Sequence, residues 1–244
     1  MREHEIITGI TQDITDKINL ENKLQSTSNI LENISHELKS PLLNVIEVCN
    51  FLQEGKLNIE QDKYISIINE TITFLITVIN NILEVSKINA DKILLYEESY
   101  NIKELIYKII ENFSLSANNK NLKLEYNFSE NIPEFIYGDK NKIHQILNNL
   151  LSNAIRYTFK GNIQLNINLK EQDIYFYIID SGIGISLDNQ KEIFKPFTQF
   201  TKNAIGTGLG LSICKTLVET MNGKIGFKSD LNIGSTFWFC VKIK

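Results

Sequence analysis

The feature that most constrains the fold of this 244-residue chain is a repeated three- and four-residue spacing of apolar positions in its first third. One series comprises Leu20, Leu24, Thr27, Leu31, Ile34, Leu38, Pro41, Val45, Val48 and Leu52. A second series comprises Ile65, Ile68, Ile72, Leu75, Ile79 and Ile82. This is the heptad spacing of helices that pack lengthwise. Polar residues around Gly55 separate the two series, so the pattern predicts a helical hairpin.

Each predicted helix carries an apolar stripe that is broader than one partner helix covers. Two copies of the hairpin would bury the remaining apolar surface between them. The sequence therefore predicts a homodimer in which residues 20–88 of two chains form a four-helix bundle.

After residue 88 the heptad spacing ends, and short strands alternate with helices. We expect strands at residues 122–128, 162–169, 174–179, 224–228 and 236–243. We expect helices at residues 102–115, 140–157, 189–194 and 209–221. This alternation predicts a second, α+β domain that begins near residues 89–91. Residues 6–17 resemble a short strand passing into a helix cap, which is too short for a domain.

Composition excludes several classes of protein. With 25 basic and 29 acidic side chains the net charge is −4, so we expect no direct binding to nucleic acid. The three cysteines (Cys49, Cys214 and Cys240) lie far apart and form no metal-binding or disulfide pattern. No apolar run approaches the 18 or so residues that span a bilayer, and no signal peptide is evident. We therefore expect the chain as given to be soluble.

On the first heptad series, His36 falls at position f, which faces away from the bundle. A lone histidine more often has a structural role, and its position alone does not distinguish a functional role from a structural one. The neighbouring residues favour function, because Glu37 could accept one ring proton and leave the other nitrogen nucleophilic. Pro41 should bend the helix about one turn later.

In the predicted helix at residues 140–157, Asn149 and Asn153 are four residues apart and share a face with Arg156. Such amides are often merely exposed. Alternatively, amide oxygens are acceptable ligands for Mg²⁺ beside phosphates, and an arginine binds phosphate well. This face is thus a candidate site for a metal–nucleotide complex.

Two glycine-rich segments adjoin regular elements. The first, D-S-G-I-G-I, begins at Asp180 where a predicted strand ends, and the second, G-T-G-L-G-L, begins at Gly206 and opens a predicted helix. Glycine lets backbone N–H groups approach a ligand, and a helix N-terminus attracts phosphate. Asp180 could accept the amine of a purine. Phe194 and Phe197 form an apolar hinge before residues 198–205, which resemble a flexible cover.

The order of these five motifs resembles the transmitter region of a sensor histidine kinase. The resemblance implies that His36 accepts phosphate with Glu37 as its base, and that the second domain is an α/β sandwich of the gyrase, chaperone and histidine-kinase superfamily. It implies ATP and Mg²⁺ as cofactors, with Asn153 as metal ligand. The implied cofactor-binding residues are Asn149, Asn153, Arg156, Tyr157, Asp180, Gly182, Gly184, Lys202, Gly206, Thr207, Gly208, Leu209 and Gly210.

The resemblance also implies a domain layout and partners. Residues 1–19 resemble the end of a PAS sensory domain, residues 20–90 the dimerisation and phosphotransfer domain, and residues 91–244 the catalytic domain. The implied reaction moves the γ-phosphoryl group of ATP to His36 and then to an aspartate of a response-regulator receiver domain. The implied location is the cytoplasm or a plastid stroma, with any membrane anchor preceding Met1.

Three features depart from the family pattern. Ile205 stands where the cover segment usually has glycine, and Lys202 is the single cation of that segment. Ser40 stands where strong phosphatase members often carry threonine or asparagine. Arg156 replaces the more frequent lysine, which keeps the charge and alters the geometry.

Two other functions remain open at this stage. A hydrolytic ATP-driven clamp of the same superfamily carries a glutamate four residues before the metal-binding asparagine, and here that position is Asn149. A non-catalytic dimeric scaffold would bind nucleotide without delivering phosphate. His4 and His144 match no motif position, and we interpret both as structural.

Overall fold

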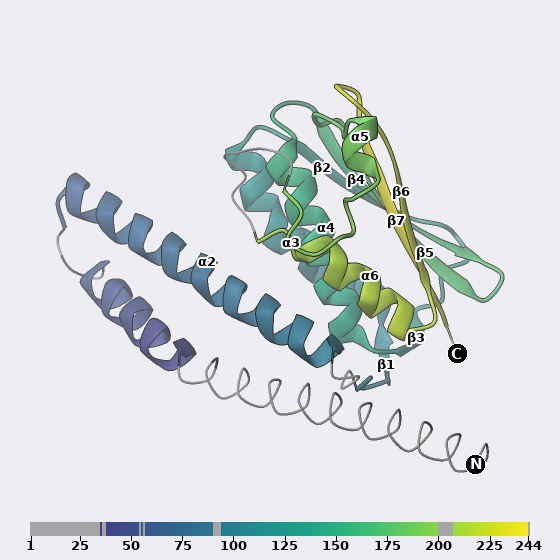
Figure 1. The fold of residues 1–244 in the computed structure, drawn as a ribbon, viewed down its shortest axis with the longest axis horizontal. Coiled ribbons are helices and arrows are strands. Elements are labelled where there is room, and N and C mark those ends of the chain that lie inside the picture. The colour runs from purple at the N-terminus through teal and green to yellow at the C-terminus, as the bar shows by residue number, and fades with distance from the viewer. Residues whose placement is uncertain are drawn as a thin grey trace, which may run out of the picture. The chain divides into compact units, whose positions relative to one another are not determined.

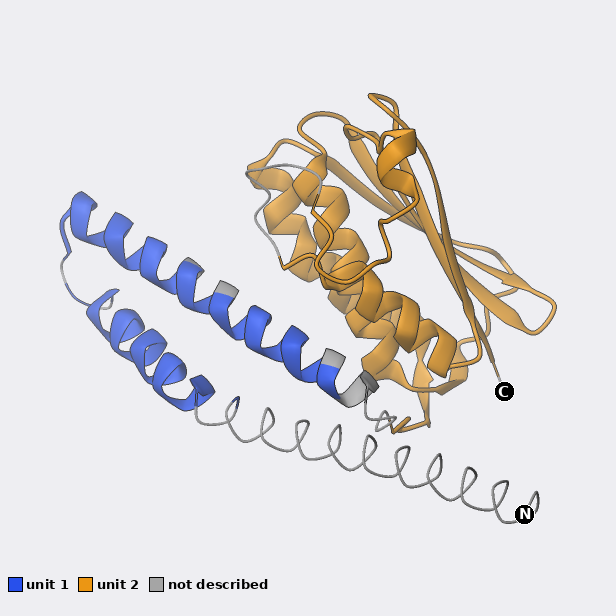
Figure 2. Ribbon diagram, viewed as in Figure 1, with its two compact units in different colours: residues 1–93 blue, residues 94–244 orange. Residues whose placement is uncertain are grey.

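The computed structural model describes residues 35, 38–53, 55, 57–89, 94–199 and 207–243, with no side chain described at positions 70, 74, 85 and 87–89. The chain divides into two compact units, residues 1–93 and residues 94–244 (Figure 2).

The first unit contains the predicted helical hairpin. Residues 38–53 are helical, and α2 (Ile59–Asn89) follows after a short turn (Figure 1). In the turn the Gly55 amide donates to the Leu52 carbonyl at 3.1 Å. Asn58 and Gln61 exchange two backbone-to-side-chain hydrogen bonds of 2.8 and 3.0 Å, which cap the start of α2. The described first helix, residues 38–53, includes Pro41.

The apolar residues of α2 form two stripes with different burial. Ile65 and Ile72, seven residues apart, are buried within the first unit. Ile68, Leu75 and Ile82, also seven apart, remain 42, 41 and 39% exposed. One heptad stripe therefore packs inside the hairpin, and a parallel stripe has no covering partner among the described residues.

The first helix has the same division. Its internal side carries Ser35, Leu42 and Cys49, of which Ser35 and Cys49 are buried and Leu42 is half-buried. The series that the sequence analysis assigned to the bundle seam is exposed in its described part: Leu38, Val45, Val48 and Leu52. That series therefore does not form the contact inside the hairpin.

By length and composition, residues Ile59–Glu84 of α2 could cross a membrane, which the sequence analysis did not expect. The segment is not a continuous apolar run, because Asn69, Asn80 and Asn81 interrupt it. Its many isoleucines raise the average hydropathy, as they do in core helices of bundles. A membrane-spanning helix and a helix packed in a bundle therefore share this length and composition.

The second unit is built on a five-stranded sheet with the order β2-β4-β5-β7-β6. The strands are β2 (Lys123–Phe128), β4 (Asn162–Lys170), β5 (Asp173–Asp180), β6 (Lys224–Asp230) and β7 (Gly234–Lys242). Strands β2 and β4 are parallel, and every other pair is antiparallel. All five strands match the sequence prediction within two residues at each end. A separate antiparallel pair, β1 (Glu98–Asn101) and β3 (Phe135–Gly138), was not predicted.

Three helices cover one face of this sheet (Figure 1). They are α3 (Ile102–Asn119), α4 (Lys140–Tyr157) and α6 (Gly210–Thr220). The expected helix at residues 189–194 is wrong in its bounds, because α5 spans only Leu187–Gln190 and residues 191–194 form turns. The helices and the sheet together form the two-layer α/β sandwich that the sequence predicts.

The core lies between these layers. Alternate residues of the central strands point into it, among them Ile163, Leu165, Ile174, Phe176, Ile178 and Phe239, all fully buried. The rings of Phe176 and Phe239 stack across neighbouring strands with centroids 4.6 Å apart. Burying each such side chain contributes about 1.5–3 kcal/mol. The core holds α4 and α6 in place, and these helices carry the candidate site.

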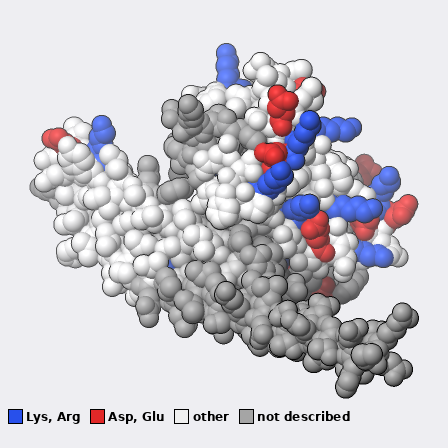
Figure 3. All heavy atoms as spheres, viewed as in Figure 1, with Lys and Arg blue, Asp and Glu red and all other residues white. Residues whose placement is uncertain are grey.

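The surface and the cysteines agree with the composition. Lys and Arg side chains lie among Asp and Glu over the second unit, in the face shown in Figure 3. Cys49, Cys214 and Cys240 are all buried free thiols, as expected of cysteines that pack as small apolar residues. His144 contacts Asn148 within α4 at 3.2 Å, which agrees with a structural role.

Candidate nucleotide-binding site

The first part of the candidate site is one face of α4. Asn149, Asn153 and Arg156 follow at intervals of four and three residues and are all half-buried. The opposite face of the helix enters the core through fully buried residues such as Leu147 and Leu151. Neither amide side chain makes a hydrogen bond with another described residue, so both are available to a ligand.

The start of α6 adjoins this face. A methyl group on Gly210 would stand 3.1 Å from Asn149 Oδ1, so the first turn of α6 lies against the Asn149 side chain. Leu209 occupies the N-cap and provides no side-chain cap. A helix start without a cap leaves backbone N–H groups to bind an anion. This end of the site is therefore suited to phosphate.

The loop before α6 depends on glycine. Gly208 has φ +70°, which favours glycine, and a methyl group there would lie 2.7 Å from the Phe197 carbonyl carbon. The hydroxyl of Thr207 accepts a hydrogen bond of 3.2 Å from the Leu209 amide. The chain at Gly208 consequently runs directly against residues 197–198.

The second part of the site is Asp180, at the end of β5. Its Oδ1 accepts hydrogen bonds from the Gly182 amide at 2.9 Å and the Ser235 amide at 3.3 Å. Among the described residues no group donates to Oδ2. Burial raises the pKa of Asp180, and the two backbone hydrogen bonds oppose that rise. The carboxylate is thus oriented through one oxygen and presents the other as an acceptor.

The turn after Asp180 is fixed to the end of α4. The Ile183 amide donates to the Tyr157 carbonyl at 3.2 Å. A methyl group on Gly182 would lie 2.6 Å from the same carbonyl oxygen, so no side chain fits there. The Asp180 carboxylate and the Tyr157 end of α4 are therefore neighbours, as a site for one purine requires.

A cation from α3 secures the same end of α4. The ammonium group of Lys120 donates to the Ile155 carbonyl at 2.8 Å and to the Arg156 carbonyl at 3.4 Å. A positive charge at a helix C-terminus interacts favourably with the helix dipole. This contact fixes the backbone that carries Arg156 and Tyr157.

The Phe194–Phe197 segment has two different parts. The ring of Phe194 packs edge-on against Phe227 of β6, with centroids 5.9 Å apart. Phe197 is 69% exposed and has φ +61°. The first phenylalanine therefore attaches the segment to the sheet, and the second lies where the chain turns toward Gly208.

Two residues of this region were not identified from the sequence. Ser235 holds Asp180 through its backbone amide, and only the β5–β7 pairing brings these positions together. Thr158 is fully buried beside Gly182, and no described residue forms a hydrogen bond with its hydroxyl. In the sequence, Thr158 could have been identified from its place directly after Tyr157, at the end of the helix that carries the paired asparagines.

The structure thus brings two pairs of predicted residues together. Asn149 meets Gly210, and Tyr157 meets the Asp180–Gly182 turn. Gly184, with φ +65°, continues that turn against the backbone of Asp230. The predicted residues His36, Glu37, Lys202 and Gly206 lie outside the described residues.

The donor set around Asn153 fits Mg²⁺. In the described part of the chain, no group of three His, Cys, Asp or Glu side chains could hold a metal ion. Mg²⁺ is commonly bound through one or two protein oxygens, with phosphate oxygens and waters completing its shell. Asn153 Oδ1 offers such an oxygen on the face that Asn149 shares with the start of α6.

Comparisons with known proteins support this interpretation of the site. Residues 138–244 match the family model described as histidine kinase-, DNA gyrase B- and HSP90-like ATPase, and residues 26–91 match the His Kinase A (phospho-acceptor) domain. The peroxide stress-activated histidine kinase mak2 of Schizosaccharomyces pombe is 34% identical over 231 residues, or 89% of this chain. The signal transduction histidine-protein kinase BarA of Escherichia coli is 34% identical over 226 residues, or 88% of this chain.

Solved structures give the same result. Full-length ShkA in complex with AMPPNP superposes with a TM-score of 0.74 at 29% identity, covering 87% of this chain and 45% of ShkA. The catalytic domain of the histidine kinase ThkA superposes with a TM-score of 0.54 at 30% identity, covering 60% of this chain and 97% of that domain. ThkA in complex with the response regulator protein TrrA gives a TM-score of 0.62 at 26% identity, covering 93% and 66%.

The chain spans only 10% of mak2 and 24% of BarA. It nevertheless covers nearly all of a solved histidine-kinase catalytic domain and carries a phospho-acceptor domain before its ATPase domain. The chain therefore belongs to the histidine kinase family and contains the transmitter region of a sensor histidine kinase.

Proposed function

We propose that this chain transfers the γ-phosphoryl group of ATP to a ring nitrogen of His36. A bond forms between that nitrogen and the γ-phosphorus, the bond from the γ-phosphorus to the bridging oxygen breaks, and ADP leaves. Glu37 accepts the proton of the other ring nitrogen as the imidazole gains positive charge. The observation that carries the proposal is that the middle of α4 meets the uncapped start of α6 at Asn149, while the C-terminal end of the same helix meets the Asp180–Gly182 turn.

Each part of the nucleotide then has a proposed partner. The exocyclic amine of adenine donates to Asp180 Oδ2, and Tyr157 packs on the ring. Gly206, Thr207, Gly208, Leu209 and Gly210 surround the phosphates with backbone N–H groups, and Arg156 and Lys202 supply positive charge. Positioning and neutralisation of charge account for most of the catalysis in such transfers. These groups suffice to hold the triphosphate in a fixed orientation.

Mg²⁺, with Asn153 as its protein ligand, supplies neutralisation of charge on the phosphate oxygens when it is bound. The family match and the AMPPNP complex of ShkA support the use of ATP. The unpartnered amide of Asn153 supports the use of the metal.

We also infer that the hairpin forms a homodimer through residues 20–88. The exposed stripe of Ile68, Leu75 and Ile82, and the exposed series from Leu38 to Leu52, would be covered by a second copy. In the face shown in Figure 3, the described hairpin carries charged side chains at its tip and is mostly uncharged along its length, which agrees with such an interface.

The proposed partner in signalling is a response-regulator receiver domain, which takes the phosphoryl group from His36 onto an aspartate. The ThkA–TrrA complex supports this partner. We keep the domain layout of 1–19, 20–90 and 91–244, with the first segment as the end of a PAS domain. We place the chain's activity in the cytoplasm or a plastid stroma, with no direct contact to nucleic acid.

Labelling with γ-labelled ATP tests the proposal against its two alternatives. The proposal predicts label on the protein that is lost in acid and retained in base, as a phosphorus–nitrogen bond requires. A hydrolytic clamp would release labelled phosphate without labelled protein, and a scaffold would bind ATP and do neither.

The variant Glu37→Ala tests the proposed base. Loss of a general base typically lowers a rate by about 10²–10⁴-fold, so this variant should label slowly while keeping its affinity for ATP. Lys108→Ala, an exposed change on α3, serves as the control and should label normally. Labelling of Glu37→Ala at the wild-type rate would remove Glu37 from the mechanism.

A further inference from the structure

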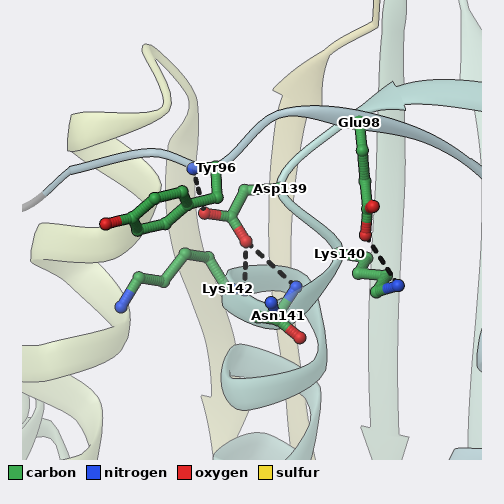
Figure 4. Close-up of polar contacts among 6 residues, drawn as sticks. All are labelled: Tyr96, Glu98, Asp139, Lys140, Asn141 and Lys142. Carbon is green, nitrogen blue, oxygen red and sulfur yellow. Dashed lines mark hydrogen bonds and ion pairs between the residues drawn. The ribbon is translucent and has the colours of Figure 1, made fainter.

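The chain enters the second unit through residues 94–97, which have no regular structure and precede β1. The backbone amide of Tyr96 donates a hydrogen bond of 2.9 Å to Asp139 Oδ2 (Figure 4). The two residues are 43 positions apart in sequence. A single side chain therefore ties the entering segment to the start of α4.

The other oxygen of the same carboxylate caps α4. Asp139 is the N-cap residue, and its Oδ1 accepts from the amides of Asn141 and Lys142, both at 3.0 Å. The residue is only 3% exposed. Because Asp139 is buried, little water competes for its oxygens, and this contact is well suited to hold the segment. One carboxylate oxygen, Oδ1, thus caps α4, and the other, Oδ2, holds the entering segment.

The segments that follow Tyr96 and precede Asp139 also pair with each other. The β1–β3 register sets Glu98 opposite Gly138, so the entering chain and the residue before the cap run side by side. Lys140 and Glu98 form an exposed ion pair of 2.6 Å next to it. An exposed pair of this kind contributes little. The buried carboxylate is therefore the stronger connection between the two segments.

The helix that Asp139 caps is the one that carries the nucleotide residues. Asn149 lies ten positions after Asp139, about 15 Å along the helix axis. Asn153, Arg156 and Tyr157 follow on the same rigid element. A displacement of the helix start is therefore carried to the whole nucleotide face.

We propose that Asp139 is a positioning residue that couples the segment entering the catalytic unit to the nucleotide-binding helix. With the hydrogen bond in place, a movement of the chain at residues 94–97 displaces α4. Without it, the segment moves and α4 keeps its place. This inference rests on the proposed function for its effect on phosphoryl transfer, and its structural part is tested independently.

The cap and the connection can be separated by substitution. Asp139→Asn keeps one oxygen, and asparagine caps helices as well as aspartate does. Its NH₂ group cannot accept from the Tyr96 amide, so the connection is lost and the cap stays. Asp139→Ala removes both. Tyr96→Pro removes the donor and leaves Asp139 intact, whereas Tyr96→Ala keeps the amide and is its matched control.

Hydrogen exchange of the full chain tests the contact and the coupling. In the wild type the Tyr96 amide should be protected, and Asp139→Asn should speed its exchange about tenfold or more, as the loss of a charge-assisted hydrogen bond implies. The first amides of α4 should stay protected in Asp139→Asn and lose protection in Asp139→Ala. Coupling is reciprocal, so bound ATP should slow exchange at residues 94–97 in the wild type and not in Asp139→Asn.

Labelling with γ-labelled ATP then tests the functional effect. Asp139→Asn and Tyr96→Pro should keep the KM for ATP within about twofold and lower kcat about tenfold, while Tyr96→Ala and Lys140→Gln behave as the wild type. Equal exchange at Tyr96 in wild type and Asp139→Asn, or an unchanged kcat in an active enzyme, would overturn the inference. A wild-type chain that binds ATP and acquires no label would instead overturn the proposed function, and the exchange experiment would still decide whether Asp139 couples the two segments.

Discussion

The helical hairpin and the α/β unit bury their apolar residues in different ways. In the α/β unit, side chains from both layers meet in a closed core, and Ile106, Leu147, Phe176 and Phe239 are fully buried. In the hairpin, the 31-residue helix α2 buries Ile65 and Ile72, and leaves Ile68 and Leu75 more than 40% exposed. The α/β unit therefore covers its apolar core within one chain, whereas the described hairpin leaves one apolar stripe of α2 uncovered.

This difference parallels the proposed division of labour. The described nucleotide residues, from Asn149 to Gly210, all belong to the α/β unit. The proposed phosphate acceptor, His36, lies in the sequence that matches the phospho-acceptor domain. We therefore expect nucleotide binding to depend on one chain alone, and the stability of the hairpin to depend on the concentration of protein. The predictions below test this contrast.

The largest expected effect is on the core of the α/β unit. Phe176→Ala should lower its free energy of unfolding by about 3–5 kcal/mol, because a fully buried ring is removed and a cavity is left. Denaturant titration measures this loss, which should not vary with protein concentration. Leu231→Ala, at a 56% exposed position, should have little effect. A strong concentration dependence of the Phe176→Ala transition would contradict the self-contained core.

The next effect concerns the exposed stripe of the hairpin. Leu75→Glu places a charge where the proposed dimer buries leucine, at a cost of several kcal/mol for the two copies together. Light scattering at micromolar concentration should show a monomer for this variant and a dimer for the wild type. Asn80→Glu adds the same charge at another exposed position of α2 and should remain dimeric. A wild-type chain that is a stable monomer would remove the argument for the bundle.

Asp180→Asn tests the nucleotide site by itself. The substitution replaces the acceptor Oδ2 with a donor, so the adenine amine loses its partner, at a cost of about 1–3 kcal/mol or roughly 5- to 150-fold in affinity. Calorimetric titration with ATP measures the loss. Asp173→Asn, at the other end of β5, should bind normally. Wild-type affinity in Asp180→Asn would mean that Asp180 only shapes its turn.

The smallest effect is a pH dependence. Burial raises the pKa of Asp180 above its ordinary value of 3.8, so the folded protein holds this proton more tightly than the unfolded chain. Its protonation therefore favours the free folded state at low pH, and this contribution is lost as the pH rises through the raised pKa. Binding of the adenine amine needs the ionised carboxylate as acceptor. The affinity for ATP should therefore weaken, by about a few-fold, as the pH falls through the raised pKa of Asp180. Calorimetry at several pH values should show this dependence in the wild type and not in Asp180→Asn.

Much of the fold follows from local spacing in the sequence. The helix Lys140–Tyr157 and the strands β2 and β4–β7 begin and end close to their predicted positions, because the spacings of apolar residues in helices and strands are local signals. The residues of the glycine-rich turns were likewise identified from type and order. The prediction that the second unit is an α+β domain needed no contact between distant residues, whereas the α/β sandwich was implied by the family resemblance.

The remaining features depend on long-range pairing. Strands β1 and β3 are four residues long and have no clear alternation, so only their mutual pairing reveals them. The amides of Ser235 and Tyr96 act on Asp180 and Asp139 from far along the chain, and a backbone donor leaves no trace in residue type. Similarly, the heptad series ending at Leu52 was correctly identified as apolar, but spacing alone does not say which of two apolar stripes faces the other helix.

The most direct test of the account is a comparison of ATP binding and labelling in His36→Gln. The substitution removes the proposed acceptor nitrogen and leaves every proposed nucleotide-binding residue in place. The account predicts that calorimetry gives the wild-type affinity for ATP, and that γ-labelled ATP leaves no acid-labile phosphate on the protein. Acid-labile label on His36→Gln would show that the acceptor lies elsewhere, and a loss of ATP affinity would show that the hairpin takes part in binding the nucleotide.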